Sequence, residues 1–417
     1  MDSPIYEMSI NLNVLNHLGL KLYSNVPAVL SEAVANSWDA DAENVDIKIE
    51  SDRITITDDG HGMTVDDINE KYLTVGYERR KHDLVHTPGN RRPVMGRKGI
   101  GKLSLFSIAD IVEVQSFRES RNGFVMSARE IEAQIGEGNK GTYNPKPLPD
   151  DKITLQGKGT RIVLTELKKQ VFRAPTALKK RLARRFSIMG AEHNFKVHVN
   201  GEVVGIEDRD YFHKLQYLWR YGDDSDKYVE FCNSEKLKHT EVREGEVHLR
   251  SDQGLAAAAC RVAGWIGTSL GSGDLKDGED NLNKIIIMVR GKLAQEDILE
   301  EFTEGGLYTK YLIGEINADF LDLDDQDDIA TSNRQEIIKD APRYQALREW
   351  VQDELKYIKS QWTDLRKEKG IEEASQNPAI QEWVSNLTGG RKRQAKSLLG
   401  KIGGIIYDTN HRSLFSF

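Results

Sequence analysis

The chain has 417 residues, of which 38% are hydrophobic and 30% charged, and this composition is typical of a globular protein with a sizeable core. Its net charge of −8 argues against a generally basic nucleic-acid binder, and no apolar run approaches the roughly 20 residues that span a bilayer. The start, MDSPIYEMSINLN, does not resemble a secretory signal, and Cys232 and Cys260 match no metal or disulfide spacing. We therefore expect a protein of a reducing, cytoplasmic compartment, with no membrane partner.

The first part of the chain, residues 1–168, alternates helix-like and strand-like segments. Periodicity predicts a helix over 27–38, a hairpin of strands at 45–50 and 53–60, helices near 65–75 and over 101–110, strands at 111–117 and 124–129, a loop over 136–149 and a strand at 159–167. Strands mixed with helices on one side indicate a two-layer α/β sandwich.

The pattern starts again in residues 169–340, which we expect to form a second α/β domain. A helix is predicted over 174–186, and strands at 195–204, 261–267, 284–293 and 311–321. The rest, residues 341–417, is predicted to be helical. The whole chain is therefore expected to have an α+β fold in three parts.

A heptad pattern of apolar residues runs from Tyr344 to Leu365 in this tail and is expected to end at Gly370 and the Asn377–Pro378 pair. The helix can pack on the second domain or pair with another chain. We favour packing within the chain, because three heptads are marginally stable alone.

Glu32, Asn36 and Asp39 form a polar stripe on the first helix, which is otherwise mostly apolar. Their spacing of four and three residues places them along one face. Burying a carboxylate and an amide without partners costs several kcal/mol, so this stripe is expected to face a ligand.

Three glycine-bearing motifs follow that helix: DDGHGM at 58–63, GRKGIGKLS at 96–104 and GKGT at 157–160. Each is weak alone, although a glycine-rich loop before a helix can bind phosphate through free N–H groups. The middle motif is not a Walker loop, because Leu103 stands where a Ser or Thr must bind magnesium. Its glycine spacing also differs from the dinucleotide fingerprint.

Together, the order ExxxNxxDA, DxGxGM, GxxGxGK and GT resembles the Bergerat ATP-binding fold of the GHKL superfamily, which includes gyrase B, heat-shock chaperones, histidine kinases, MutL and MORC proteins. The resemblance implies that Glu32 activates the attacking water, that Asn36 binds Mg²⁺, and that Asp58 accepts the adenine amino group. Asp39 belongs to the first box, either as a structural or as a ligand contact. The remaining residues implied to bind ATP are Gly60, Gly62, Met63, Gly96, Lys98, Gly99, Ile100, Gly101 and Thr160.

Hydrolysis of ATP needs a positioned base, a metal and neutralisation of the phosphate charge, and these residue types supply all three. Hard oxygen ligands such as Asn36 suit Mg²⁺, which keeps several waters. Lys98 and Lys102 are both candidates to contact the phosphates, with Lys102 also a candidate catalytic residue. The carboxylate of Glu32 and the short segment before the first helix favour an ATPase over a histidine kinase.

In related dimeric ATPases a second, transducer domain reaches the γ-phosphate, and residues 170–340 resemble it more weakly. The segment DIATSNRQEI at 328–337 makes Arg334 our candidate catalytic arginine, with Lys292 as the alternative. The resemblance also implies that ATP drives formation of a homodimer, with residues 1–20 as a strap that crosses to the partner.

Three functions fit this architecture. The first is an ATP-gated dimeric clamp on nucleic acid, and the second is a chaperone-like ATPase that remodels a protein client. The third is the ATPase component of a restriction or antiviral defence system whose effector partner supplies the toxic activity, because no nuclease motif is evident. Basic stretches at 168–185 and 391–401 fit either contact with DNA or a solvated helix face.

Overall fold

The computed structural model describes residues 26–77, 80, 85–97, 99–136, 143–168, 175–188, 193–249, 258–278, 280–302, 306–324, 326, 328–329, 337–391 and 394–395. The chain divides into two compact units. The first contains residues 1–210, 288–294 and 322–337, and the second contains residues 211–287, 295–321 and 338–417. The α+β fold class is confirmed. The domain limits at 168 and 340 stay a prediction.

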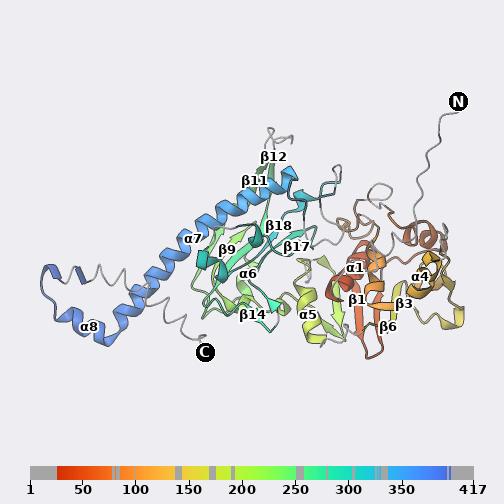
Figure 1. The fold of residues 1–417 in the computed structure, drawn as a ribbon, viewed down its shortest axis with the longest axis horizontal. Coiled ribbons are helices and arrows are strands. Elements are labelled where there is room, and N and C mark those ends of the chain that lie inside the picture. Colours follow the sequence, from red (N-terminus) through yellow and green to blue (C-terminus); the bar gives the residue numbers. More distant parts are fainter. Residues whose placement is uncertain are drawn as a thin grey trace. The chain divides into compact units, whose positions relative to one another are not determined.

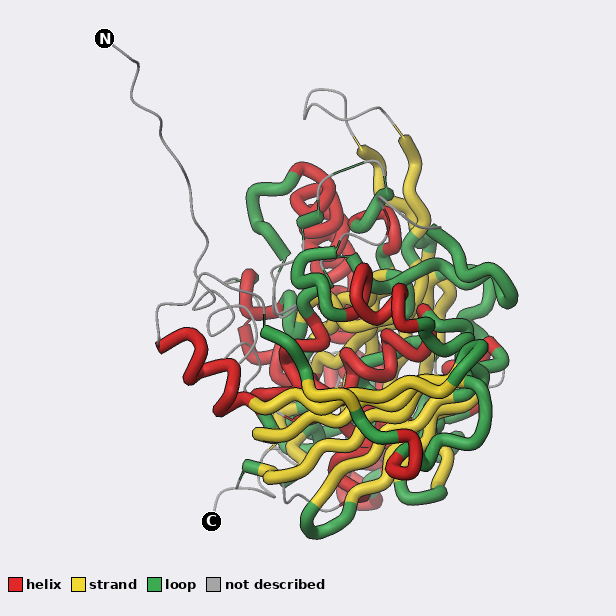
Figure 2. Tube along the Cα trace, turned by 90° about the vertical axis from the view of Figure 1, so that its right-hand side faces the viewer, coloured by secondary structure: helices red, strands yellow, loops and turns green. Residues whose placement is uncertain are grey.

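An eight-stranded sheet forms one layer of the first unit (Figures 1 and 2). Its strands, in spatial order, are β5 (Lys146–Pro147), β4 (Arg121–Ser127), β3 (Ala109–Phe117), β6 (Gly159–Leu167), β2 (Arg53–Asp58), β1 (Asn44–Ile49), β7 (Lys196–Val199) and β8 (Glu202–Val203). Neighbours are antiparallel except for β1 and β7. The predicted hairpin is β1–β2, in which Ile47 faces Ile56.

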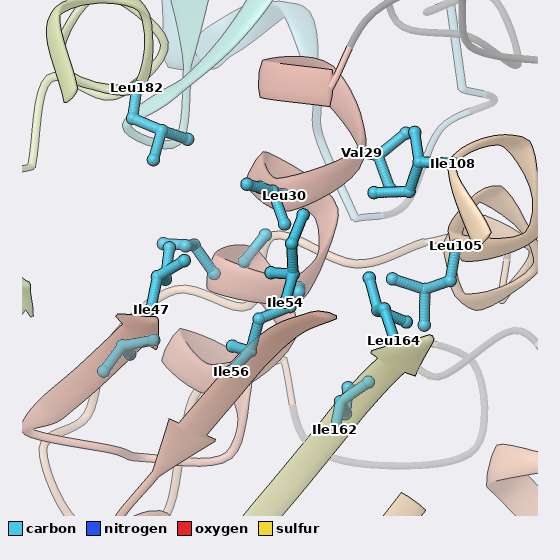
Figure 3. Packing of buried hydrophobic residues seen from close by; sticks show 14 of the residues in the cluster. Val29, Leu30, Ile47, Ile54, Ile56, Leu105, Ile108, Ile162, Leu164 and Leu182 are labelled. Atoms are coloured by element: carbon cyan, nitrogen blue, oxygen red, sulfur yellow. The ribbon is translucent and has the colours of Figure 1, made fainter. Parts of the chain in front are cut away.

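The predicted first helix is α1 (Val26–Asp39), and it packs on the sheet through its apolar face. Figure 3 shows Val29 and Leu30 of this helix with Ile54 and Ile56 of β2 beneath them. All four side chains are buried. Because alternate residues of a strand point to opposite faces, the apolar set of β2 holds the helix over the sheet. This packing sets the distance between β2 and the polar stripe of α1, which is Glu32, Asn36 and Asp39.

Three further segments of the first unit differ in part from the sequence prediction. The predicted helix over 101–110 is a 3₁₀ helix, Gly101–Ser107, and β3 already begins at Ala109. The predicted strand over 124–129 ends at Ser127, and α4 (Ala128–Gly136), a helix that the sequence did not predict, follows it. The helix near 65–75 is a short α2 (Val65–Asp67) with a capping box at Thr64, continued by a π-helix, Ile68–Tyr72.

The predicted helix over 174–186 is α5 (Pro175–Ala183), and its basic side chains have acidic partners within the chain. Lys179 contacts Glu202 and Asp208, and Lys180 contacts Asp210. These ion pairs favour the interpretation of the described part of this basic stretch as a solvated helix face.

The second unit is built on a six-stranded sheet. Its strands, in spatial order, are β10 (His239–Arg243), β9 (Leu215–Tyr221), β13 (Ala263–Ser269), β18 (Leu312–Asn317), β16 (Ile285–Val289) and β17 (Lys292–Gln295). Two-stranded ribbons join β11 (Glu246–Leu249) to β12 (Ala258–Arg261), and β14 (Lys276–Asp277) to β15 (Asp280–Asn281). The predicted strand over 284–293 is thus two strands, which a turn at Arg290 and Gly291 separates, both with positive φ.

The predicted tail helix is α7 (Pro342–Gln376), the long helix labelled in Figure 1. Its heptad side chains Tyr344, Leu347, Val351 and Ile358 are buried within the second unit, as expected for packing inside the chain. Gly370 does not end the helix, and that part of the prediction is wrong. The break comes at Asn377, which caps α8 (Pro378–Ser385) ahead of a first-turn proline.

The remaining helices are short: α6 (Lys227–Glu230) and 3₁₀ turns at Asp150–Lys152, Glu207–Arg209, Phe212–Lys214, Leu299–Glu301, Gly306–Tyr311 and Asp319–Leu321. Among the described residues, no helix is long and apolar enough to cross a membrane. Both cysteines are free thiols. The proposed strap, Lys98, Arg334 and most of the basic stretch 391–401 lie outside the described residues.

Candidate nucleotide-binding site

A cavity of about 740 Å³ opens in the first unit beside the polar stripe of α1. This volume lies within the range of roughly 300–1,000 Å³ that is usual for small-ligand sites. The predicted site residues that line it are Glu32, Asn36, Asp39, Asp58, Gly62, Met63, Gly96, Gly99, Ile100, Gly101, Lys102 and Thr160. The cavity therefore brings together residues that the sequence scatters over 129 positions.

Glu32, Asn36 and Asp39 all line the cavity, but their surroundings differ. The side chain of Asn36 is exposed, whereas Asp39 is buried. The carboxylate oxygens of Asp39 accept hydrogen bonds of 2.8 Å from the N–H groups of Met95 and Gly96. Asp39 therefore fixes the start of the glycine loop to α1. Of the two roles predicted for Asp39, a structural contact or a ligand contact, these hydrogen bonds supply the structural contact.

Asp58 lies at the end of β2, and its half-buried carboxyl group lines the cavity. Its Oδ2 accepts a hydrogen bond from the hydroxyl of Ser37, 3.0 Å away. Its Oδ1 accepts from the N–H of Gly60 at 3.0 Å and of Thr160 at 3.2 Å. Burial raises the pKa of Asp58 to about 6, against the lowering effect of these donors. A buried acceptor at this place suits the amino group of an adenine.

Two glycines at the cavity wall stand where a side chain would collide with a neighbouring residue. Gly62 has a φ of +67°, and a Cβ there would meet the carbonyl oxygen of Phe117 at 2.2 Å. Gly101 begins the 3₁₀ helix, and a Cβ there would meet Oε2 of Glu32 at 2.6 Å. The glycine loop therefore passes close to the candidate base because it carries no side chain at this position.

Lys102 lines the cavity, but its ammonium group bonds to backbone oxygens in this structure. It donates to the carbonyls of Lys71 at 3.2 Å and Thr74 at 2.7 Å, and it lies 5.6 Å from the ring centre of Tyr72. Burial lowers its pKa to about 8. Lys98, the other candidate for the phosphates, is not among the described residues.

Lys292, the first residue of β17, lines the same cavity and belongs to the first unit. Its Nζ lies 2.8 Å from Oε1 of Glu32. The lysine side chain is 4% exposed and the glutamate side chain 13%. This ion pair places the alternative phosphate contact directly beside the candidate base, while Arg334 lies outside the described residues.

Several residues of the site were absent from the sequence prediction. Ser37 and Tyr72 line the cavity, and so does Tyr77. Ser37 lies one position after Asn36, about 100° around the helix from the stripe. It therefore does not share the spacing that links Glu32, Asn36 and Asp39. Tyr72 and Tyr77 carry no motif, and only the fold brings them to the cavity. Gly60 does not line the cavity, although its N–H donates to Asp58.

A Mg²⁺ ion at this site would be held partly by oxygen atoms of phosphates and water, and only partly by protein side chains. The described residues include no group of three or more His, Cys, Asp or Glu side chains able to bind a metal ion. Mg²⁺ characteristically uses one or two protein oxygens together with phosphates and water. The exposed amide of Asn36 on the cavity wall, one turn from Glu32, fits that pattern.

Comparison with known proteins agrees with this geometry. A family model described as "Histidine kinase-, DNA gyrase B-, and HSP90-like ATPase" matches residues 23–160. The chain is 42% identical over 370 residues to a protein named "Putative type II restriction enzyme HgiDII" from Herpetosiphon aurantiacus. That match covers 88% of this chain and 58% of the relative.

Two more distant relatives match smaller parts of the chain. The "DNA mismatch repair protein MutL" of Halobacterium salinarum is 29% identical over 185 residues, which is 42% of this chain and 23% of that protein. The "Chaperone protein HtpG" of Francisella tularensis subsp. novicida is 26% identical over 188 residues, 39% of this chain and 28% of that protein. The chain thus spans little more than half of the first relative and about a quarter of the others. The family match and these relatives, together with the α+β fold around the cavity, show that residues 23–160 form a domain of the GHKL superfamily.

Proposed function

We propose that the protein binds and hydrolyses Mg-ATP, and that it is the ATP-gated component of a DNA-processing or defence system. The observation that carries the first half is the carboxylate of Glu32 on the cavity wall, in contact with the buried ammonium of Lys292. A base beside a buried cation fits a site in which water attacks a phosphate group.

The adenine end of the nucleotide is assigned to the deep part of the cavity. Asp58 accepts the amino group of the base, and Thr160 and Met63 flank it. Gly62 lines the same end of the cavity, where its φ of +67° and the backbone of Phe117 disfavour any residue with a side chain. The hydrogen bonds from Ser37, Gly60 and Thr160 support this assignment, because they hold the Asp58 carboxyl group in a fixed orientation at the cavity wall.

The phosphates are assigned to the glycine loop. Backbone N–H groups of Gly96, Gly99, Ile100 and Gly101 cradle them, and Lys98 or Lys102 adds charge. Mg²⁺, bound by Asn36 and phosphate oxygens, would supply further neutralisation of the charge that develops in the transition state. Lys102 must leave the carbonyls of Lys71 and Thr74 to take part.

In the hydrolysis step, Glu32 orients the attacking water and accepts its proton. Lys292 contacts the γ-phosphate, and its pairing with Glu32 at the cavity wall supports this role. The ammonium group changes partner from carboxylate to phosphate when ATP binds, which leaves the carboxylate able to accept a proton.

The second half of the proposal rests on the relatives. One is named as a putative restriction enzyme and another as a mismatch repair protein, and both names concern DNA. We propose that two copies of the chain close on DNA when ATP is bound, and that an effector acts on the DNA with them. The chaperone-like alternative has its own support in the HtpG match.

ATP turnover by the wild-type protein and by Glu32→Ala tests the first half. We expect the variant to bind ATP, to lose hydrolysis by about a hundredfold or more, and to accumulate as the closed dimer. A variant that hydrolyses ATP like the wild type would contradict the assignment of the base.

DNA binding and DNA-stimulated turnover across a salt series test the second half. We expect stimulation that falls as salt rises, because contacts to phosphates release counterions. Turnover that responds to an unfolded protein client, with no DNA binding at low salt, would instead favour the chaperone-like function.

A further inference from the structure

Asp322 bridges two arginines of the segment that carries the glycine loop. Its Oδ2 lies 2.7 Å from Nη1 of Arg80, and its Oδ1 lies 2.6 Å from Nη1 of Arg97. Arg97 follows Gly96 directly and lines the cavity. One carboxylate from residues 322–337 is therefore shared between two points of the loop region.

The stem of the glycine loop, residues 94–96, is held from both sides. Its N–H groups at Met95 and Gly96 donate to Asp39 on α1. Its carbonyls at Val94 and Met95 accept from Nη2 of Arg80, at 2.8 and 3.1 Å. Asp39 holds one edge of the stem, and Arg80, oriented by Asp322, holds the other.

Arg97 is anchored to the same acidic segment by more than one bond. Besides Asp322, its guanidinium donates to the carbonyl of Leu323 at 3.2 Å and to that of Gln326. These contacts turn the side chain at the start of the glycine loop towards residues 322–326. Arg97 is therefore held in place just before the described part of the glycine loop that follows, Gly99 to Gly101.

This cluster is buried enough for its ion pairs to matter. The side chains of Arg80 and Asp322 are 4% and 13% exposed. Exposed pairs contribute little, whereas removing one partner of a buried pair leaves an uncompensated charge. Asp324, two residues on, contacts Arg290 at 2.7 Å and Arg80 at 3.5 Å, but the structure gives it no bond to Arg97.

We propose that Asp322 is a positioning residue for the phosphate-binding loop, acting through Arg97 and Arg80. The inference rests on the proposed ATP-binding function and extends it beyond residues 23–160, which the family model matches. It makes the affinity for the nucleotide phosphates depend on a carboxylate more than 200 positions away from the loop.

A positioning role of Asp322 can be told from a merely structural role by comparing the binding of two ligands. Asp322 contacts the phosphate end of the site, and Asp58 forms the adenine end. Loss of the Asp322 carboxylate should therefore weaken binding of a triphosphate and leave binding of adenosine unchanged. A general loosening of the fold would weaken both.

The experiment measures binding of AMP-PNP by calorimetry and of adenosine by ligand-observed NMR, on the full chain. We expect Asp322→Asn to weaken AMP-PNP about tenfold, within the range of coupling energies of contacting charged groups. Asp322→Glu should recover part of the loss. The double variant Asp322→Asn, Arg97→Gln should lose less affinity than the two single losses combined, because Arg97 carries part of the effect of Asp322 and Arg80 carries the rest. Asp324→Asn is the matched control, and we expect it to change AMP-PNP affinity much less.

Two results would overturn the proposal. The first is AMP-PNP affinity of Asp322→Asn equal to that of the wild type. The second is an equal loss of adenosine and AMP-PNP. The affinities of Arg97→Gln for AMP-PNP and adenosine are measured as well, and the same two results for this variant would overturn the proposal. The test therefore does not depend on whether the Asp322 variant folds. Failure of the wild-type protein to bind either ligand would instead refute the proposed function.

Discussion

The ammonium of Lys292 lies 2.8 Å from the carboxylate of Glu32, although 260 positions separate the two residues in the chain. The candidate base is therefore paired with a cation that a triphosphate would also attract. Because a charge can satisfy only a few partners at once, binding of ATP should redistribute this pair. The following predictions test the site that this contact organises.

Replacing Lys292 with methionine should separate binding from hydrolysis. We expect turnover to fall about a hundredfold, as when an enzyme loses a donor to the developing charge, while ADP still binds. Steady-state ATPase assays and ADP calorimetry give the two values. Lys310→Met, at an exposed position, is the control.

The same assays on Arg334→Met decide between the two candidate phosphate contacts. If turnover is normal in Lys292→Met and lost in Arg334→Met, the arginine is the contact and our assignment of Lys292 is wrong. We expect the reverse result.

Asp58→Asn should abolish nucleotide binding yet stabilise the protein at neutral pH. The pKa of Asp58 is raised to about 6, so between pH 4 and pH 6 the folded state binds more protons than the unfolded state. The free energy of unfolding of the wild type therefore falls as the pH rises through this window, by roughly 3 kcal/mol. Asparagine does not ionise, so the free energy of unfolding of Asp58→Asn does not fall in this pH window.

Denaturant unfolding at pH 4.5 and pH 7.5 measures this effect. The stability advantage of Asp58→Asn over the wild type should be larger at pH 7.5. An advantage that is the same at both values would mean that Asp58 titrates normally.

Ser37→Ala should weaken ATP binding in a manner that depends on pH. The Ser37 hydroxyl donates to Asp58 and lowers the pKa of that carboxyl group, so its loss should raise the pKa further. We expect weaker binding at pH 6.5 and partial recovery at pH 8.5, where Asp58 is ionised again. Ser37→Thr, which keeps the hydroxyl, is the control, and an affinity deficit independent of pH would contradict this role.

Gly101→Ala should impair hydrolysis more than binding. A methyl group at this position would lie 2.6 Å from Oε2 of Glu32, so the base must move. Displacements of about 1 Å cost on the order of a hundredfold in rate, and we expect kcat to fall by that amount. Gly157→Ala is a matched control, because a Cβ there meets nothing within 4 Å. Equal activity of the two variants would show that the close approach has no effect.

The spacing of apolar residues was sufficient to predict a helix or strand where that element buries one regular face. The helix at 27–38, the strands at 45–50 and 53–60 and the tail helix were predicted because their apolar residues repeat with the period of the element. It failed at 101–110, where a glycine-rich start and a short run give a 3₁₀ helix. It failed also at Gly370, because one glycine costs only about 1 kcal/mol in a helix of 35 residues.

The sequence by itself determined that the part around residues 23–160 is a GHKL domain and that the fold is α+β, because the motif residues stand in short segments with fixed order. It left open the role of Asp39 and could not choose between Lys292 and Arg334. Only the tertiary structure brought Lys292 to Glu32, Ser37 to Asp58 and Asp322 to Arg97. These contacts depend on how helix and strands pack and on where the chain returns to the first unit, and no local periodicity encodes that return.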